Sequence, residues 1–363
     1  MLTEKESKNH RKESIYLYKT RMGSGKSIEM SREEIKSDIE KGVEAAVENG
    51  GVDPLDRDEI ERLVELHCIP AKFIGIERGR ELVTTFDGGS IKLKRLNISL
   101  GRIVDAQIFE RVLCTDSAEF AHVDYSFKPI KPIVDSEQIE FKQALQVTVV
   151  PMFYGAMPNL SLYYEPVGSQ PNPSTVMMEE GDIPKARRSI EKTVEMGVKD
   201  MVFVSRKMHE VGADGINFDT VGSAGEGDFL ASLLAAEKLK EMYPDICIEM
   251  GMSSEFILGM HGDLEYKGVN LAGLYPHEQV QLAEKAGVTI FGPVVNVEVN
   301  KSCPWNLARS LTLYKACREA SSIPIHANVG MGVGGVPMSE VPPIDATTRT
   351  SVAMAEIGKM DGL

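Results

Sequence analysis

Short apolar segments alternate with longer helical patterns over the greater part of this chain, from about Phe141 to Ile357. This alternation is typical of parallel strands joined by helical crossovers, because a parallel connection needs a dozen or more residues. A break in one predicted helix is expected near Gly197. The predicted strands are 146–153, 215–219, 246–250, 288–295 and 323–329, and the predicted helices are 183–210, 228–242, 276–286, 304–320 and 345–357.

The absence of a second pattern among these segments favours a TIM (β/α)₈ barrel over an open doubly wound sheet, although periodicity alone does not separate the two. Only about six of the eight strands of such a barrel are recognisable before the chain ends. The last residues, Met360 to Leu363, are typical of a turn that leads a helix into another strand. We therefore expect a C-terminally truncated, unclosed barrel at 136–363, with an N-terminal α+β segment at 1–135 packed on it.

Composition narrows the class of protein. The net charge of −14 argues against nucleic acid or an anionic membrane as the main partner. The sequence has no apolar run of transmembrane length and no signal-peptide core. Its 5 cysteines are scattered without a CxxC pair, which favours a reduced cytoplasm and argues against a structural zinc.

The N-terminal segment has one motif that resembles half of a phosphate loop, Arg21 to Ser27 (RMGSGKS). Thr20 stands where the full motif needs a glycine, and no strand precedes it, so a polar turn is the better interpretation. Helices are predicted from Ser31 to Asn49 and, capped by Asp56, through His67. Short strands are predicted over 70–113, around a turn at 87–89.

Two carboxylates end predicted strands, where a barrel places its chemistry. Glu249 ends an apolar run and has little structural reason to be there, so we predict a functional role: binding or deprotonating a small ammonium group. Asp219 precedes the glycine-rich stretch 222–227. It either serves the same chemistry or binds loop amides as a cap.

Tyr154 and His326 complete the list of candidate catalytic residues. The Tyr154 hydroxyl is able to orient a substrate, although a ring packed under the barrel rim is the more ordinary role for it. His326 lies inside an apolar strand, where a histidine is usually a satisfied core residue but is also able to point into the barrel.

A glycine loop follows the strand of His326. It formally matches GxGxxG, but the prolines behind it prevent a helix, so dinucleotide binding is not expected. We predict instead that the loop lets a bulky group approach the backbone. The glycines concerned are Gly330, Gly332, Gly334 and Gly335. A second motif, His261 to Glu265 (HGDLE), suits a solvated loop better than a metal site, and no metal is expected.

Several long motifs resemble the dimethylamine:corrinoid methyltransferases of methylotrophic methanogens. The resemblance extends from about Arg21 to Leu363. The motifs that carry it are HVDYSFKPIKP (122–132), FYGAMPN (153–159), GADGINFDTVGSAGEGD (212–228), LGMHGDLEYKGVNLAGLYPHEQ (258–279), WNLAR (305–309), GMGVGGVPM (330–338) and PPIDATTR (342–349).

The resemblance implies a TIM barrel that moves a methyl group from dimethylamine to the Co(I) corrinoid of a small partner protein. The corrinoid belongs to that partner, so no cofactor bound directly by this chain is expected. The family places pyrrolysine, encoded by an amber codon, directly after the residues that match Asp361 to Leu363. The resemblance thus implies a chain that ends at the amber codon. Such a chain retains the residues that line the site, lacks the electrophilic pyrrolysine and is inactive. A homo-oligomer is also expected.

Two alternatives remain open from the residues. The chain would be a non-catalytic binder of the corrinoid protein if it bound that protein without turnover. It would be an unrelated TIM-barrel enzyme, with Glu249 and His326 as an ordinary acid–base pair, if it turned over a substrate without any downstream extension.

Overall fold

A computed structural model describes residues 16–76, 82–83, 92–93, 98–99, 118–123, 130–156, 158–222, 224–259, 263–339 and 341–363. The turn predicted at 87–89 lies outside these residues. Near it, β3 (Lys92–Leu93) pairs antiparallel with β4 (Ile98–Ser99).

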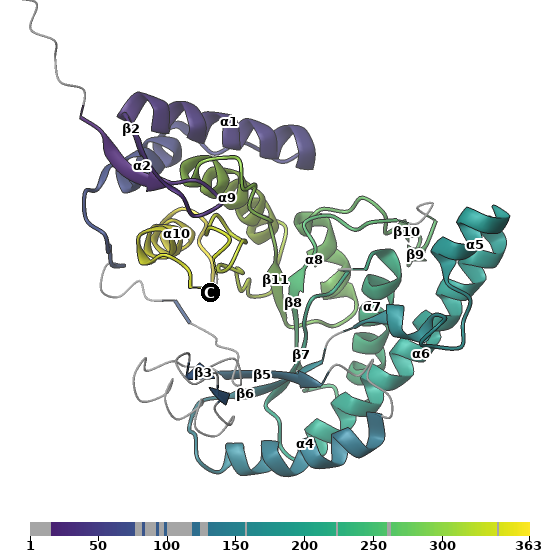
Figure 1. The fold of residues 1–363 in the computed structure, drawn as a ribbon. Coiled ribbons are helices and arrows are strands. Elements are labelled where there is room, and N and C mark those ends of the chain that lie inside the picture. The colour runs from purple at the N-terminus through teal and green to yellow at the C-terminus, as the bar shows by residue number, and fades with distance from the viewer. Residues whose placement is uncertain are drawn as a thin grey trace, which may run out of the picture.

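Five parallel strands form the central sheet, in the order β11-β8-β7-β6-β5 (Figure 1). Isolated parallel bridges continue this pairing from Phe291 to Ile325, from His326 to Gly362 and from Gly362 to Val83. The strands are β5 (Ala118–Val123), β6 (Met152–Ala156), β7 (Gly215–Phe218), β8 (Cys247–Ser253) and β11 (Ile290–Pro293).

Within the described residues, parallel pairing therefore passes through eight backbone segments: 83, 362, 325–326, β11, β8, β7, β6 and β5. The expected total of about six was too low, because the segments at Val83 and Gly362 are too short to show a pattern. Gly362 already enters parallel pairing, although the sequence predicted a turn at 360–363 with the strand only beyond it. This fold is mixed α/β around a parallel sheet, and its closure into a barrel stays a prediction.

The helices lie around the outside of this sheet, and their ends follow local capping chemistry (Figure 1). Asp182 accepts a hydrogen bond from the Lys185 N–H at the start of α6, and Ser302 does the same for Trp305 at the start of α9. The helices are α4 (Ile130–Leu145), α5 (Pro173–Glu180), α6 (Ile183–Glu210), α7 (Glu226–Met242), α8 (Pro276–Lys285), α9 (Cys303–Glu319) and α10 (Ile344–Glu356), and a 3₁₀ turn spans Leu160–Tyr163.

The predicted break near Gly197 is wrong, since α6 continues unbroken through it. A Cβ at Gly197 would lie 2.6 Å from Cδ2 of Leu160. The glycine therefore lets the 3₁₀ turn approach the helix closely and does not end the helix.

The N-terminal part forms a hairpin and two helices that pack on α9 and α10 (Figure 1). Capping boxes at Ser31 and Asp56 start α1 and α2, which confirms both predicted helices. The elements are β1 (Tyr18–Arg21), β2 (Ser27–Met30), α1 (Arg32–Gly50) and α2 (Arg57–Cys68). β5 lies before residue 136 and belongs to the central sheet, while the predicted division at that residue stays a prediction.

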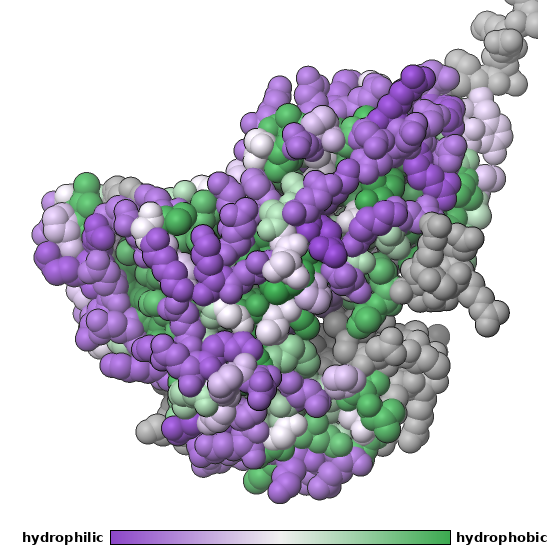
Figure 2. Space-filling model, turned by 180° about the vertical axis from the view of Figure 1, so that it is seen from behind, coloured by the Kyte–Doolittle hydropathy of each residue, from purple (hydrophilic) through white to green (hydrophobic). Residues whose placement is uncertain are grey.

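Most of the apolar core lies between the sheet and its helices. On the face shown in Figure 2, hydrophilic side chains cover much of the helices, and hydrophobic ones are seen mainly between them. A small antiparallel pair, β9 (Glu265–Tyr266) and β10 (Val269–Asn270), lies at the edge. None of the helices in the described ranges is long and apolar enough to cross a membrane.

Candidate functional site

Glu249 and His326, predicted from separate strand ends, are in direct contact. Oε1 of Glu249 is hydrogen bonded to Nδ1 of His326, and the glutamate side chain is buried. The backbone fixes both residues. Glu249 lies in β8, opposite Ile290 of β11, and the His326 N–H donates to the Phe291 carbonyl at 2.9 Å. The segment 325–326, which pairs parallel with β11, thus places the His326 imidazole beside the Glu249 carboxylate.

The charges around His326 determine its protonation. Burial by itself would lower the pKa of His326, because the charged form is poorly solvated. The charge of Glu249 and its hydrogen bond oppose burial, with smaller contributions from a Leu363 backbone hydrogen bond and the charge of Asp219, and the net result is a raised pKa. The imidazole therefore holds its proton to higher pH than a free histidine, directly against a carboxylate.

The face of the sheet that carries Glu249 also carries Asn217 and two glycines. Asn217 of β7 is in register with Glu249 of β8, so both side chains project to the same face. A Cβ at Gly251 would lie 2.7 Å from Oδ1 of Asn217, and one at Gly292 would lie 2.8 Å from Nδ2 of Asn328. These glycines make room on this face for two amide side chains.

Sequence reasoning did not select Asn217 as a site residue. An asparagine at a strand end is usually a turn or cap residue, so its type gave no signal. The only signal was its position, one residue on from Ile216 and two before Asp219, on the strand that precedes that of Glu249.

Asp219 has the second of the two roles that the sequence allowed, and the first, action on an ammonium group, stays a prediction. Its Oδ1 accepts a hydrogen bond from the Thr220 N–H at 2.7 Å, so it binds a loop amide. Its negative charge also contributes to the raised pKa of His326. Asp219 therefore lies close enough to influence the Glu249–His326 pair while it supports its own turn.

Tyr154 is not brought to this pair. It is fully buried on the opposite face of β6, in register with Ile216, and its ring meets that of Phe141 edge to face at 5.7 Å. Its hydroxyl donates to Oε2 of Glu137 at 3.4 Å, on α4. This is the packed ring that we considered the more ordinary role, and the period of two in a strand explains it.

The glycine loop is largely explained by its own packing. Gly332, Gly334 and Gly335 have φ of 82°, 66° and 87°, a region that favours glycine. Cβ atoms on them would lie within 2.3–2.7 Å of Met338, the Asn328 carbonyl and the Leu307 backbone, respectively. Gly330 differs, because no other described atom lies within 4 Å of where its Cβ would be. Of the four glycines, only Gly330 therefore leaves space for the predicted approach of a bulky group to the backbone.

A pocket of about 300 Å³ opens beyond the ends of β7, β8 and β11. One of its walls is Glu255, which forms a buried ion pair with Arg309 of α9. Oε2 of Glu255 accepts from the Asn296 N–H at 2.9 Å, and Arg309 donates to the Asn296 carbonyl at 3.2 Å. Sequence reasoning missed this pair, since its members are 54 residues apart and neither ends a predicted strand. The lining residues are Thr220, Gly222, Ser254, Glu255, Phe256, Leu258, Val294, Asn296 and Val333.

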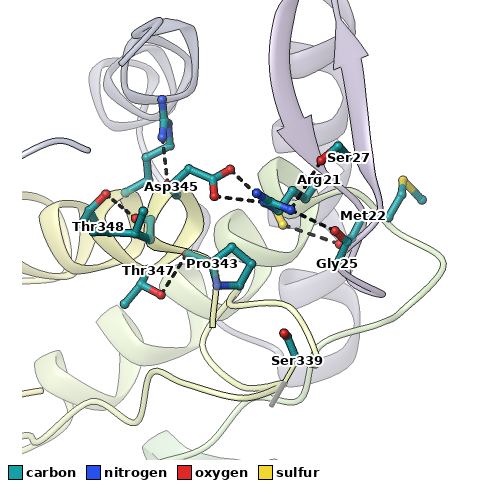
Figure 3. Close-up of polar contacts among 12 residues, drawn as sticks. Arg21, Met22, Gly25, Ser27, Ser339, Pro343, Asp345, Thr347 and Thr348 are labelled. Carbon is teal, nitrogen blue, oxygen red and sulfur yellow. Dashed lines mark hydrogen bonds and ion pairs between the residues drawn. The ribbon is translucent and has the colours of Figure 1, made fainter. Parts of the chain in front are cut away.

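The described residues of the two motifs set aside above form structural contacts. The RMGSGKS segment is the turn between β1 and β2, and Arg21 donates to both carboxylate oxygens of Asp345 at 3.0 and 2.9 Å and to the Gly25 carbonyl at 3.1 Å (Figure 3). In the HGDLE segment, Asp263 forms an ion pair with Arg187, while His261 lies outside the described residues. Across the described ranges, no cluster of three or more His, Cys, Asp or Glu side chains is arranged to hold a metal.

Solved structures with a similar chain path include a phosphonomutase described as putative, from Burkholderia cenocepacia J2315, with 10% identity, a TM-score of 0.36, and coverage of 69% of this chain and 80% of that chain. A monomeric dihydrodipicolinate synthase variant has 13% identity and a TM-score of 0.34, and the match covers 69% of this chain and 63% of that chain. The carboxyl transferase domain of Rhizobium etli pyruvate carboxylase has 13% identity and a TM-score of 0.39, and the match covers 77% of this chain and 39% of that chain. Scores this low carry no argument about fold or function.

A family model matches the chain much more extensively. The model describes dimethylamine methyltransferases, and the match covers residues 16–363. It therefore includes all the site residues discussed above, from Tyr154 to Gly335. This chain belongs to the dimethylamine methyltransferase family.

Proposed function

We propose that this protein moves a methyl group from dimethylamine to the Co(I) corrinoid of a cognate partner protein, with Glu249 and His326 as its proton-handling pair. The family match supports methyl transfer from dimethylamine. The corrinoid acceptor and its carrier protein come from the motif resemblance. The corrinoid enters as a co-substrate on the partner, and Gly330, which follows the strand segment of His326, offers an open backbone position.

The observation that carries the proposal is the buried contact between Glu249 and His326. Dimethylamine is largely protonated at neutral pH, and an amine is a poor leaving group, so its nitrogen must be activated before the methyl group moves. A buried carboxylate attracts the ammonium group, is able to take its proton while the nitrogen adds to an electrophile, and is able to return a proton to the methylamine that leaves. His326, with its raised pKa, holds its proton beside Glu249, and the hydrogen bond between the two side chains fixes the orientation of the carboxylate.

Substitution of Glu249 by Gln tests this role in the full natural protein. The exchange keeps the shape of the side chain and removes the charge and the basic oxygen. Amine turnover should fall about a hundredfold or more, with a normal melting curve. Unchanged turnover in a folded variant would show that Glu249 is not catalytic.

Glu226→Gln is a matched control. Glu226 is also buried, but Oε2 of its carboxylate accepts from the Leu264 N–H at 3.2 Å and so holds a loop to the start of α7. The control should lower the melting temperature and leave the turnover of the folded enzyme close to that of the wild type. A similar loss of turnover in both variants would argue for a general effect of buried charge.

The same contact also suits the alternative of an ordinary acid–base enzyme with Glu249 and His326. Dependence on the corrinoid protein separates the two functions. The proposed enzyme transfers no methyl group without that protein, whereas the alternative turns over its substrate alone. The non-catalytic binder would retain the corrinoid protein in a pull-down and show no turnover.

Pyrrolysine is a further part of this proposal, and it rests on the motif resemblance. The Leu363 backbone forms a hydrogen bond with His326 and so lies beside the Glu249–His326 pair. Intact mass of the native protein, beside a methyl-transfer assay, tests this part of the proposal. A native mass of 39.9 kDa with full activity would contradict it.

A further inference from the structure

We propose that Asn217 is a second hydrogen-bond acceptor for the amine substrate and that it helps to select a secondary amine. This inference rests on the proposed function, because it names a further residue of the same site. Nothing in the sequence motifs assigned a role to this side chain.

The first observation is an unsatisfied polar atom. Asn217 is only 2% exposed, and its Oδ1 has no hydrogen-bond partner in the part of the chain that the structure describes. Buried acceptors are almost always paired, because an unpaired one loses its bonds to water and gains nothing in return. An unpaired buried acceptor beside a candidate site therefore requires an explanation, and a substrate donor supplies one.

The second observation is the place of this atom. Asn217 and Glu249 are register partners on adjacent strands, so their side chains start about 5 Å apart on one face of the sheet. The Asn217 amide extends over Gly251, two residues further along β8, where a Cβ would lie 2.7 Å from Oδ1. The unpaired oxygen therefore lies against Gly251, on the side of the register pair that faces the carboxyl ends of the strands.

The chemistry of the substrate matches two acceptors. A dimethylammonium ion has two N–H donors, one for the Glu249 carboxylate and one for Oδ1 of Asn217. A trimethylammonium ion has a single N–H donor, so it engages only one of these acceptors. Loss of the Asn217 acceptor should therefore weaken dimethylammonium more than trimethylammonium.

Substitution of Asn217 by Leu in the full natural protein provides the test. The exchange removes a buried unpaired acceptor, so the melting temperature should stay the same or rise. The affinity for dimethylammonium, measured by calorimetry, should fall about ten- to a hundredfold, since a hydrogen bond to a charged group is lost. The affinity for trimethylammonium should change less, and Asn217→Asp, which keeps an oxygen acceptor, should retain dimethylammonium binding.

Asn306→Leu is the matched control. Asn306 is equally buried, but its Oδ1 accepts from the Glu298 N–H at 2.8 Å and its Nδ2 donates to carbonyls of Glu298, Lys301 and Ser302. This control should lower the melting temperature and leave the amine affinity of the folded protein unchanged. The two leucine variants thus have opposite expected effects.

Unchanged dimethylammonium affinity in a folded Asn217→Leu variant would overturn the inference. If that variant does not fold, Asn217→Ala, which is smaller and has no side-chain acceptor, decides by the same affinity measurement. A wild type that binds the amine with these preferences but transfers no methyl group would contradict the proposed function and leave the inference intact. A wild type that transfers methyl groups, beside Asn217 variants of unchanged affinity, would contradict the inference alone.

Discussion

At the scale of single residues, His67 makes the clearest prediction outside the site. The side chain is buried, and neither ring nitrogen finds a hydrogen-bond partner among the described residues. Burial, assisted by the charge of Arg349, lowers the pKa of His67 to about 3. The ring is therefore neutral in the folded protein over the whole physiological range.

The sign of the pH effect follows from that shift. The folded pKa lies below the unfolded value of 6.5, so the unfolded chain binds the proton first, and the folded state loses stability as the pH falls below about 6.5. Between pH 7 and pH 5 this loss should be about 2 kcal/mol from His67 alone. Denaturant unfolding of His67→Leu at both pH values should show a weaker pH dependence than the wild type. An identical dependence in both proteins would mean that His67 does not titrate in this way.

Position along a strand guided the choice of candidate site residues from the sequence. Glu249 was chosen because it ends an apolar run and His326 because it lies inside an apolar strand, and the structure brings the two together. Tyr154 lies apart from them, because the face of a strand to which a residue points depends on register, which one segment alone does not reveal. Asn217 was missed since its unpaired oxygen is a property of its surroundings and not of its residue type.

At the scale of secondary structure, the packing of α1 on α9 depends on one glycine. A Cβ at Gly42 would lie 2.3 Å from the Trp305 carbonyl and 3.1 Å from Cβ of Ala308. Gly42→Ala should therefore destabilise the protein, because overpacking costs about 1–3 kcal/mol and outweighs the gain of at most about 1 kcal/mol in helix propensity. Glu44→Ala, on the exposed side of the same helix, is the control and should be close to neutral. A Gly42→Ala variant that is more stable than the wild type would show that the two helices have room to separate.

The helices that the sequence predicted are present because local residues determine helix ends, whereas α4 and α5 were not predicted. Ser31, Asp56 and Ser302 each cap the helix that follows, and the cap needs only the next few residues. The strands were harder, since β6 begins at Met152 rather than at residue 146, and the bridge at Gly362 involves hardly more than one residue. Pairing with distant segments decides where a strand begins, and that information is not local.

At the scale of the whole molecule, the N-terminal elements and the sheet should unfold as one unit. The N-terminal helices are joined to α9 and α10 by polar contacts as well as by packing. Asp38 accepts from Ser302 at 2.6 Å, and Glu59 and Glu356 form ion pairs with Lys315 and Arg62 at 2.7 and 2.9 Å. Interfaces with this much shared core favour cooperative unfolding.

The chain contains a single tryptophan, Trp305, which lies at this junction and is 6% exposed. Its fluorescence therefore reports whether α1 stays docked on α9, while far-UV circular dichroism reports the helices of the entire molecule. Because both spectroscopic signals depend on one core, they should give the same unfolding midpoint in guanidinium chloride. The Gly42→Ala exchange should shift both midpoints to the same lower denaturant concentration. A fluorescence transition that precedes the loss of helical signal would show that the N-terminal elements detach first and form a separate folding unit.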